Sequence, residues 1–116
     1  MKIPAPGKPV RGSQSGAPIM ALFDLLGRRW AMGIVWILSE QGPCTFRELQ
    51  EKCDNLSPTT LNTRIAELRA AFLVDHDATG YRVTPRGREL YEMLVPLGLW
   101  AKEWGKDLQG VPGTQS

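Results

Sequence analysis

Small polar side chains and arginines share one stretch of this chain, and together they have the chemistry to bind a nucleic acid. Between residues 57 and 64, hydroxyl, amide and guanidinium groups follow at close spacing: Ser57, Thr59, Thr60, Asn62, Thr63 and Arg64. Hydroxyls and amides can hydrogen-bond to base edges, and small residues let a helix enter the major groove. Arg47 and Arg82 lie on either side of this stretch and could bind phosphates. The composition predicts a DNA-binding surface.

The elements that would position these side chains form a helix-turn-helix. Thr45 is followed three residues later by Glu48, which is the spacing of a capping box at a helix start. Ser57 and Pro58 give a second start signal, because serine caps a helix and proline fits its first position. The second helix is expected to run to about Ala71, with an apolar face of regular spacing: Leu61, Ile65, Leu68 and Phe72.

The opposite side of this second helix is expected to face solvent or DNA. Its residues are mostly small or polar: Thr59, Thr63, Ala66, Glu67 and Ala70, with Thr60 beside them. Asn62, Arg64 and Arg69 flank this face and are expected to reach outward. The alternative is a plain amphipathic surface helix. An ordinary solvent face would carry more lysine and glutamate, since threonine is a mediocre helix former.

A short basic hairpin is predicted after the second helix. Strands are expected at Val74–Asp77 and Tyr81–Val83, and Gly80 suits the turn between them. Arg82, Arg86 and Arg88 follow with no acidic residue from 78 to 88. Arginine is favoured where a wing meets the DNA backbone or minor groove. A charged turn that only aids solubility is the alternative.

The flanking segments are also helical by pattern. Helices are expected at Ile19–Leu26 and Trp30–Ser39, and a long final helix should run from Pro85 to about Leu108. Pro96 should kink or divide that last helix. The fold class is therefore mainly α (α+β): a winged helix-turn-helix with a two-stranded wing and additional N- and C-terminal helices.

The first and last helices carry more apolar surface than one small core needs. Two tryptophans four residues apart near the end of the chain suit an interface between copies of the chain. The expected homodimer contacts come from residues 19–27 and 85–108: Leu22, Phe23, Leu26, Leu97, Trp100 and Trp104.

Charge and composition divide the chain into three parts. Residues 1–18 carry Lys2, Lys8 and Arg11 without an acid, whereas the remaining residues carry 11 bases and 12 acids. We expect residues 1–18 to be a flexible basic arm, either without a role or touching DNA or a partner subunit. Residues 19–109 should form the domain and 110–116 a disordered tail. The lack of a long apolar run or secretory signal predicts a cytoplasmic protein with no membrane contact.

The chain lacks the residue groupings that catalysis or metal binding needs. Cys44 and Cys53 flank a predicted helix and are expected to be reduced, with structural roles. With His76 as the sole histidine, they are too few for a zinc site. No glycine-rich phosphate loop or nucleophile with a partnering base is evident. We therefore expect no enzyme activity and no cofactor.

Several motifs, in order, resemble HxlR-type transcriptional regulators. Leu25–Trp30 is similar to their leucine-leucine-glycine-glycine-lysine-tryptophan signature, and Thr45–Leu49 to their phenylalanine-x-glutamate-leucine segment. Leu56–Leu68 resembles their recognition helix, and Val83–Gly87 their exit from the wing. The resemblance implies a MarR-related winged helix-turn-helix that acts as a homodimer on a palindromic operator. Ser57, Thr59, Thr60, Asn62, Thr63 and Arg64 would then lie on the recognition helix, and Arg82 on the wing.

The sequence departs from this family in three places. Many relatives carry a cysteine where this chain has Ala17, so sensing through that thiol is not available. Phe72 stands where relatives usually have glycine, which predicts a different end to the recognition helix. The hairpin is also shorter than usual.

Two other interpretations of the function remain open: a winged-helix module that binds protein, and a non-redox sensor with a small-molecule effector near Trp30 and Trp36.

Overall fold

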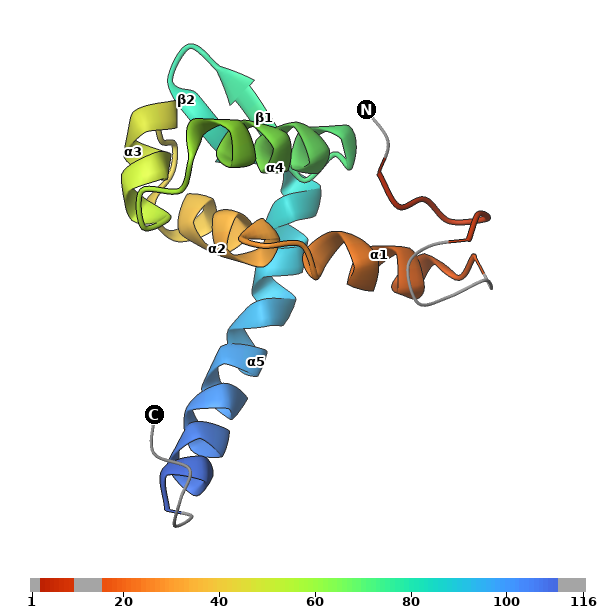
Figure 1. Cartoon of the computed structure of the whole chain (residues 1–116), viewed down its shortest axis with the longest axis vertical. Coiled ribbons are helices and arrows are strands. Elements are labelled where there is room, and N and C mark those ends of the chain that lie inside the picture. The colour runs from red at the N-terminus through yellow and green to blue at the C-terminus, as the bar shows by residue number, and fades with distance from the viewer. Residues whose placement is uncertain (1–2, 10–15, 111–116) are drawn as a thin grey trace.

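The computed structural model describes residues 3–9 and 16–110. Five helices and one two-stranded sheet follow one another in this part of the chain (Figure 1). Their bounds are α1 (Pro18–Leu26), α2 (Ala31–Gln41), α3 (Phe46–Lys52), α4 (Pro58–Ala70), β1 (Val74–Asp77), β2 (Gly80–Val83) and α5 (Pro85–Gln109). The predicted mainly helical fold class is confirmed.

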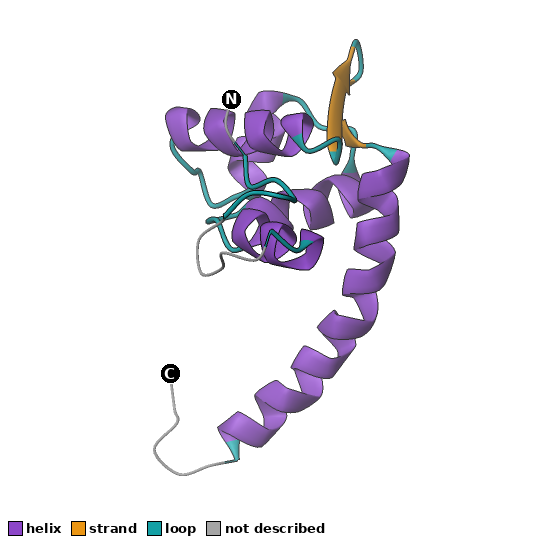
Figure 2. Ribbon diagram, turned by 90° about the vertical axis from the view of Figure 1, so that its right-hand side faces the viewer, coloured by secondary structure: helices purple, strands orange, loops and turns teal. Residues whose placement is uncertain are grey.

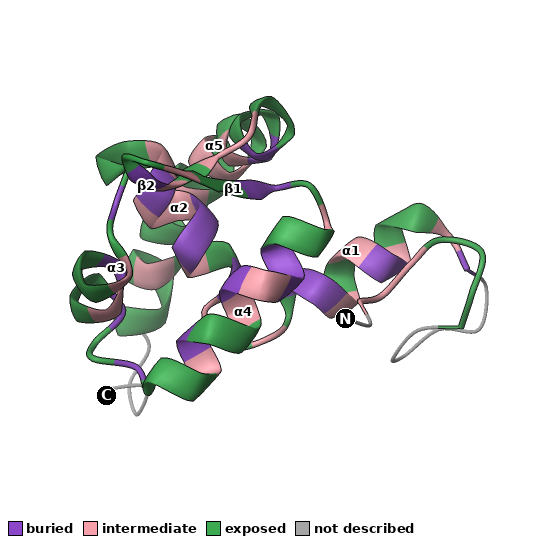
Figure 3. Ribbon diagram, turned by 90° about the horizontal axis from the view of Figure 1, so that it is seen from above, coloured by how far each residue is buried: buried purple, intermediate pink, exposed green. Residues whose placement is uncertain are grey.

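Helix α2 provides the centre of the hydrophobic core. Its Ile34, Val35 and Leu38 are buried against α4, which contributes Leu61 and Ile65. The inner side of α4 is buried and its outer side exposed, as Figure 3 shows. This division follows from the 3.6-residue period of the apolar positions, and it leaves the polar side of α4 facing solvent.

Three helix starts are fixed by side-chain caps. The Glu48 N–H donates to Thr45 Oγ1 at 3.1 Å and the Thr45 N–H donates to Glu48 Oε1 at 2.9 Å, which confirms the capping box. These bonds hold the pKa of Glu48 below its usual value. The Ser57 hydroxyl accepts from the Thr60 N–H, and the Thr84 hydroxyl accepts from the Gly87 N–H. Each cap satisfies a backbone donor that a helix start would leave unpaired.

The hairpin is antiparallel, with Val74 opposite Val83 and Asp75 opposite Arg82. Residue 44 joins it as an isolated bridge, since Cys44 and Tyr81 exchange two backbone hydrogen bonds of 3.0 and 2.7 Å. Gly80 permits this approach: a Cβ there would lie 2.5 Å from the Cys44 carbonyl oxygen. The bridge ties the start of α3 to the hairpin.

Two bulky residues adopt the left-handed conformation that favours glycine. Trp30 has φ 68°, so α2 begins at Ala31, one residue later than predicted. Phe72 has φ 63° and directly follows the last turn of α4. Its N–H donates to Arg69 O, and the Leu73 N–H donates to Leu68 O, both at 3.0 Å. This is a Schellman motif, so α4 ends as it would with glycine despite the phenylalanine.

Pro96 was expected to kink or divide the last helix, and α5 is continuous through it, so the proline does not divide the helix. The helix curves instead, and its C-terminal half extends away from the other elements (Figure 2). Residues 1–2 and 10–15 of the predicted arm and 111–116 of the predicted tail lie outside the described residues. In the described ranges, no helix is both long and apolar enough to span a membrane.

Candidate nucleic-acid interface

Helices α3 and α4 are joined by a tight turn that sets their relative position. Asp54 and Asn55 both have positive φ, of 55° and 54°, and reverse the chain within a few residues. The Gln50 side chain donates from Nε2 to Leu56 O at 2.9 Å and closes the turn. Asparagine and aspartate tolerate this left-handed geometry better than most residues. The result is a helix-turn-helix whose second helix is α4.

Three polar residues project from the exposed side of α4. Thr59, Asn62 and Thr63 are all exposed, and the partly buried Ala66 continues the same side one turn later. The Thr63 hydroxyl donates to Thr59 O at 3.0 Å, which leaves its lone pairs free to accept. Asn62 makes no hydrogen bond to any described residue, so its amide can both donate and accept. An asparagine amide can pair with two groups on the edge of adenine.

Ser57 and Thr60 stand together at the start of α4. The Ser57 hydroxyl donates to Thr60 Oγ1 at 2.9 Å and caps the helix. Both residues lie at the positive end of the helix dipole, which favours a phosphate. Their first role is therefore structural, and a contact to DNA stays a prediction.

Glu67 and Arg64 do not project outward as the sequence suggested. Glu67 is buried, and its two carboxylate oxygens accept from Arg28 and Arg64. Arg64 also donates from Nε to Arg29 O at 2.9 Å. Arg64 therefore does not reach outward as expected, and its contact to DNA stays a prediction. The sequence could have indicated only the Arg64–Glu67 pair, whose members are three residues apart on one helix. The pair of Arg28 and Glu67 could not be predicted, because 39 residues separate them.

The hairpin is less basic than its sequence suggested. Arg82 Nη1 lies 3.2 Å from Asp77 Oδ2, and Arg82 also faces Asp75 across the strands. Hydrogen bonds from Thr79 lower the pKa of Asp77, and the Arg82 charge lowers it further. Between residues 74 and 83 the hairpin thus holds two carboxylates and one arginine. The prediction that the arginine of the hairpin has no acidic residue nearby is wrong, because Asp75 and Asp77 on β1 lie close to Arg82.

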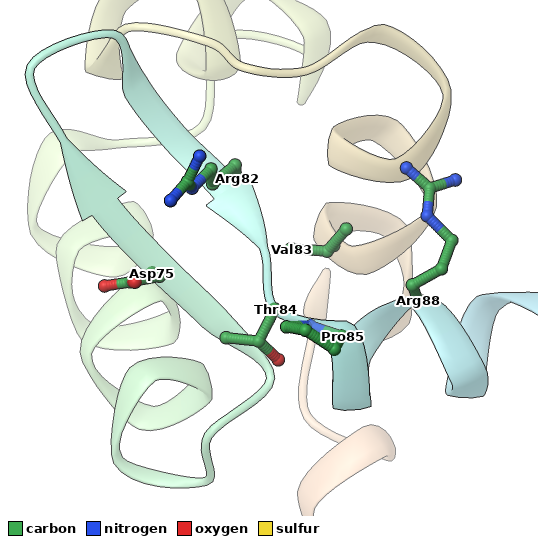
Figure 4. A pocket seen from close by; sticks show the side chains of 6 residues that line it. All are labelled: Asp75, Arg82, Val83, Thr84, Pro85 and Arg88. Atoms are coloured by element: carbon green, nitrogen blue, oxygen red, sulfur yellow. The ribbon is translucent and has the colours of Figure 1, made fainter.

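A hollow of about 440 Å³ separates the hairpin from the start of α5 (Figure 4). Arg82 and Arg88 lie on opposite sides of it, with Val83 between them, and their guanidinium groups do not converge. The Arg88 guanidinium carbon sits 5.6 Å from the centre of the Tyr91 ring. A hydrogen bond from the Tyr91 hydroxyl to Glu40 raises the pKa of Tyr91. Diverging arginines suit an extended phosphate backbone better than an enclosed small anion.

The other arginines differ in how freely they can bind an anion. Arg47 is almost fully exposed and lies 3.6 Å from Glu51, and Arg86 lies 3.4 Å from Glu89. Such exposed pairs are weak and exchange readily for a phosphate. Arg29 and Arg69 are exposed and have no acidic partner among the described residues.

Both cysteines are buried free thiols. Burial raises the pKa of Cys44 and raises that of Cys53 to about 11. Reactive cysteines need the opposite shift, because the thiolate is the nucleophile. The expected structural role fits this environment. No three metal-binding side chains come together in the described ranges.

The predicted dimer residues divide into two groups. Leu26 lies in the protomer core and Leu22 packs against it, so Leu26 adds little to the exposed apolar surface, and its place in a dimer interface stays a prediction. Phe23, Leu97, Trp100 and Trp104 are exposed. The rings of Trp100 and Trp104 are stacked, with centroids 5.8 Å apart. A hollow of about 280 Å³ lies between α2 and α5, and its lining is apolar: Met32, Gly33, Trp36, Leu94, Leu97, Gly98 and Ala101.

Residues 25–109 match the model of the HxlR-like helix-turn-helix family. The chain belongs to this family. Its relatives include the HTH-type transcriptional regulator YvaP of Bacillus subtilis, 32% identical over 70% of this chain and 81% of the relative. The regulator BH0655 of Halalkalibacterium halodurans is 33% identical over 72% of this chain and 80% of the relative. The chain is therefore an HxlR-type transcriptional regulator and not an enzyme.

Two solved structures share the fold of this chain. Quinone-bound YodB from B. subtilis aligns with a TM-score of 0.67 and 29% identity, over 73% of this chain and 96% of YodB. A possible HxlR family factor from Thermoplasma volcanium aligns with a TM-score of 0.66 and 26% identity, over 77% of this chain and 85% of that structure.

Proposed function

We propose that this HxlR-type regulator binds a palindromic operator as a homodimer, with α4 of each subunit in the major groove. The main support is the outward side of α4, where Asn62 is exposed, has no hydrogen-bond partner among the described residues, and stands between the exposed Thr59 and Thr63 in the sequence. The inner side of the same helix is packed into the core through Leu61, Ile65 and Leu68. A rigid helix with a small polar outer side is the element that such proteins use to read base edges.

Phosphate contacts come from arginines at the end of α4 and on the elements beside it. Arg69 is exposed in the last turn of α4 and Arg47 is exposed on α3, whereas Arg82 lies on the hairpin and is already paired with Asp77. Since the domain carries no net positive charge, binding depends on where these side chains stand. Arg47 and Arg69 then contribute more to the affinity than Arg82 does.

The exposed apolar residues on α1 and α5 support the homodimer. Trp100 is 61% exposed and Phe23 is 59% exposed, although both are large and apolar. Such a patch favours burial against a second copy of the chain. The two α4 helices would then face successive major grooves about one turn of DNA apart.

An effector would act without a reactive thiol. YodB is known in a quinone-bound form. This chain has Ala17 where many relatives carry a cysteine, and both of its own thiols, Cys44 and Cys53, are buried. A small apolar effector would fit the hollow beside Trp36. We expect the regulator to act in the cytoplasm, where its operator DNA is accessible.

Polarisation titrations against fragments from around its own gene test the proposal. We expect one fragment to bind far more tightly than random DNA at moderate salt, with affinity falling steeply as salt rises. Equal affinity for all fragments would refute operator binding. Absence of any salt-dependent binding would favour the alternative, a winged-helix module that binds another protein.

A further inference from the structure

Helix α4 has a buried carboxylate where it packs against the loop between α1 and α2. Glu67 is 6% exposed and is the one buried charged residue in the described part of the chain. A carboxylate this deep requires compensating donors. Arg28 Nη1 donates to Glu67 Oε2, and Arg64 Nη1 donates to Oε1 at 2.5 Å. Both oxygens of Glu67 are therefore engaged.

A third bond joins the same two parts of the molecule. Arg64 Nε donates to the backbone oxygen of Arg29 at 2.9 Å. Residues 28 and 29 belong to the loop, and residues 64 and 67 to α4. The loop is itself constrained, because Trp30 holds a left-handed backbone at the start of α2. The loop is therefore held to α4 by charge-assisted hydrogen bonds. These bonds fix the orientation of α4, whereas an apolar contact has no preferred direction.

We propose that Arg28 is a positioning residue for DNA recognition, fixing through Glu67 the angle at which α4 presents its outer side. This inference rests on the proposed DNA binding by α4. Glu67 lies one turn beyond Thr63, so rotating α4 about its axis would move both together. The loop also continues from α1, which carries the exposed Phe23. The packing of α1 in a dimer would therefore be transmitted to α4 through Arg28.

The variant Arg28→Met tests this, with Arg29→Met as the matched control. Both changes remove one positive charge from the same loop, but only Arg28 bonds to Glu67. We expect Arg28→Met to lower the ratio of operator to random-DNA affinity about tenfold. The slope of log affinity against log salt should stay unchanged, because Arg28 is not proposed to touch phosphate. Arg29→Met should leave the ratio unchanged.

Two further variants separate positioning from simple loss of stability. Arg28→Lys keeps the charge without the guanidinium fork, and we expect it to recover only part of the affinity ratio. Arg28→Met combined with Glu67→Gln removes the uncompensated carboxylate and should restore thermal stability without restoring the ratio. If Arg28→Met fails to fold, these two variants still give the comparison.

An unchanged affinity ratio in folded Arg28→Met would overturn the proposal. A salt slope reduced by about 0.9 would also overturn it, since that is the loss of one phosphate contact. Hydrogen exchange of the free protein provides a test that does not need DNA. Arg28→Met should accelerate exchange in α4 more than in α3. If the wild-type protein bound no DNA, the proposed function would fail while this exchange result still decided whether Arg28 holds α4.

Discussion

Asp77 and Arg82 form an ion pair of 3.2 Å across the turn of the hairpin. The pair places a carboxylate beside the one arginine of the wing, where DNA phosphate would have to approach. We expect Asp77→Asn to strengthen DNA binding at low salt by about threefold, because Arg82 is released and one repulsive charge is removed. The asparagine oxygen can still accept from Thr79 and keep the turn. Polarisation titrations measure the change.

The control for this variant is Asp107→Asn, which removes the same charge far along α5. It should leave DNA affinity unchanged. Equal strengthening by both variants would mean that only net charge matters and that the wing does not approach DNA.

Phe72 stores backbone strain at the end of α4. It is 77% exposed, so its ring gains little from burial, yet it holds φ 63°. We expect Phe72→Gly to raise the free energy of unfolding by about 1 kcal/mol, because glycine adopts this conformation without a Cβ clash. Phe72→Ala keeps the clash and should not stabilise the protein. Urea unfolding of the three proteins would decide, and a gain in the alanine variant alone would contradict the account.

The two thiols should be unreactive in the folded protein. Burial raises the pKa of Cys53 to about 11 and also raises that of Cys44, so neither is a thiolate near neutral pH. A thiol reagent should label both only in denaturant. Because the folded state favours the protonated Cys53, its contribution to stability is present below the unfolded pKa near 8.5 and is lost as pH rises toward 11. Rapid labelling at neutral pH would show that the core opens readily.

Trp100 should contribute to self-association. We expect Trp100→Glu to shift the protein from dimer to monomer, since a carboxylate would replace an aromatic ring within the apolar patch. Lys102→Glu, two residues further along α5, is the control for added negative charge. Sedimentation equilibrium gives the mass directly. A wild-type monomer at micromolar concentration would contradict the homodimer, whereas a dimer unaffected by Trp100→Glu would place its interface elsewhere.

Local signals in the sequence predicted most of the fold. The caps at Thr45, Ser57 and Thr84 each involve residues three apart, so their spacing can be read directly from the chain. The bonds from Arg28 to Glu67 could not be read this way, because the residues are 39 apart and meet only after folding.

The candidate site was predicted in part for the same reason. Helical periodicity placed Thr59 and Thr63 correctly on the exposed side of α4, but it also placed Glu67 there. Periodicity could not show that Arg28, from the loop between α1 and α2, would form an ion pair with Glu67 and leave it buried. Similarly, Leu26 has the spacing of a surface stripe on α1, and only the packing of α2 reveals that it belongs to the core.

The central claim is that the outer side of α4 reads DNA sequence, and Asn62→Ala tests it most directly. The measurement is the operator and random-DNA affinity of both proteins across a range of salt concentrations. We predict that Asn62→Ala weakens operator binding by about 1–3 kcal/mol, with random-DNA affinity and the salt slope unchanged. If the wild-type protein binds its operator, an operator affinity that Asn62→Ala leaves unchanged would contradict this claim.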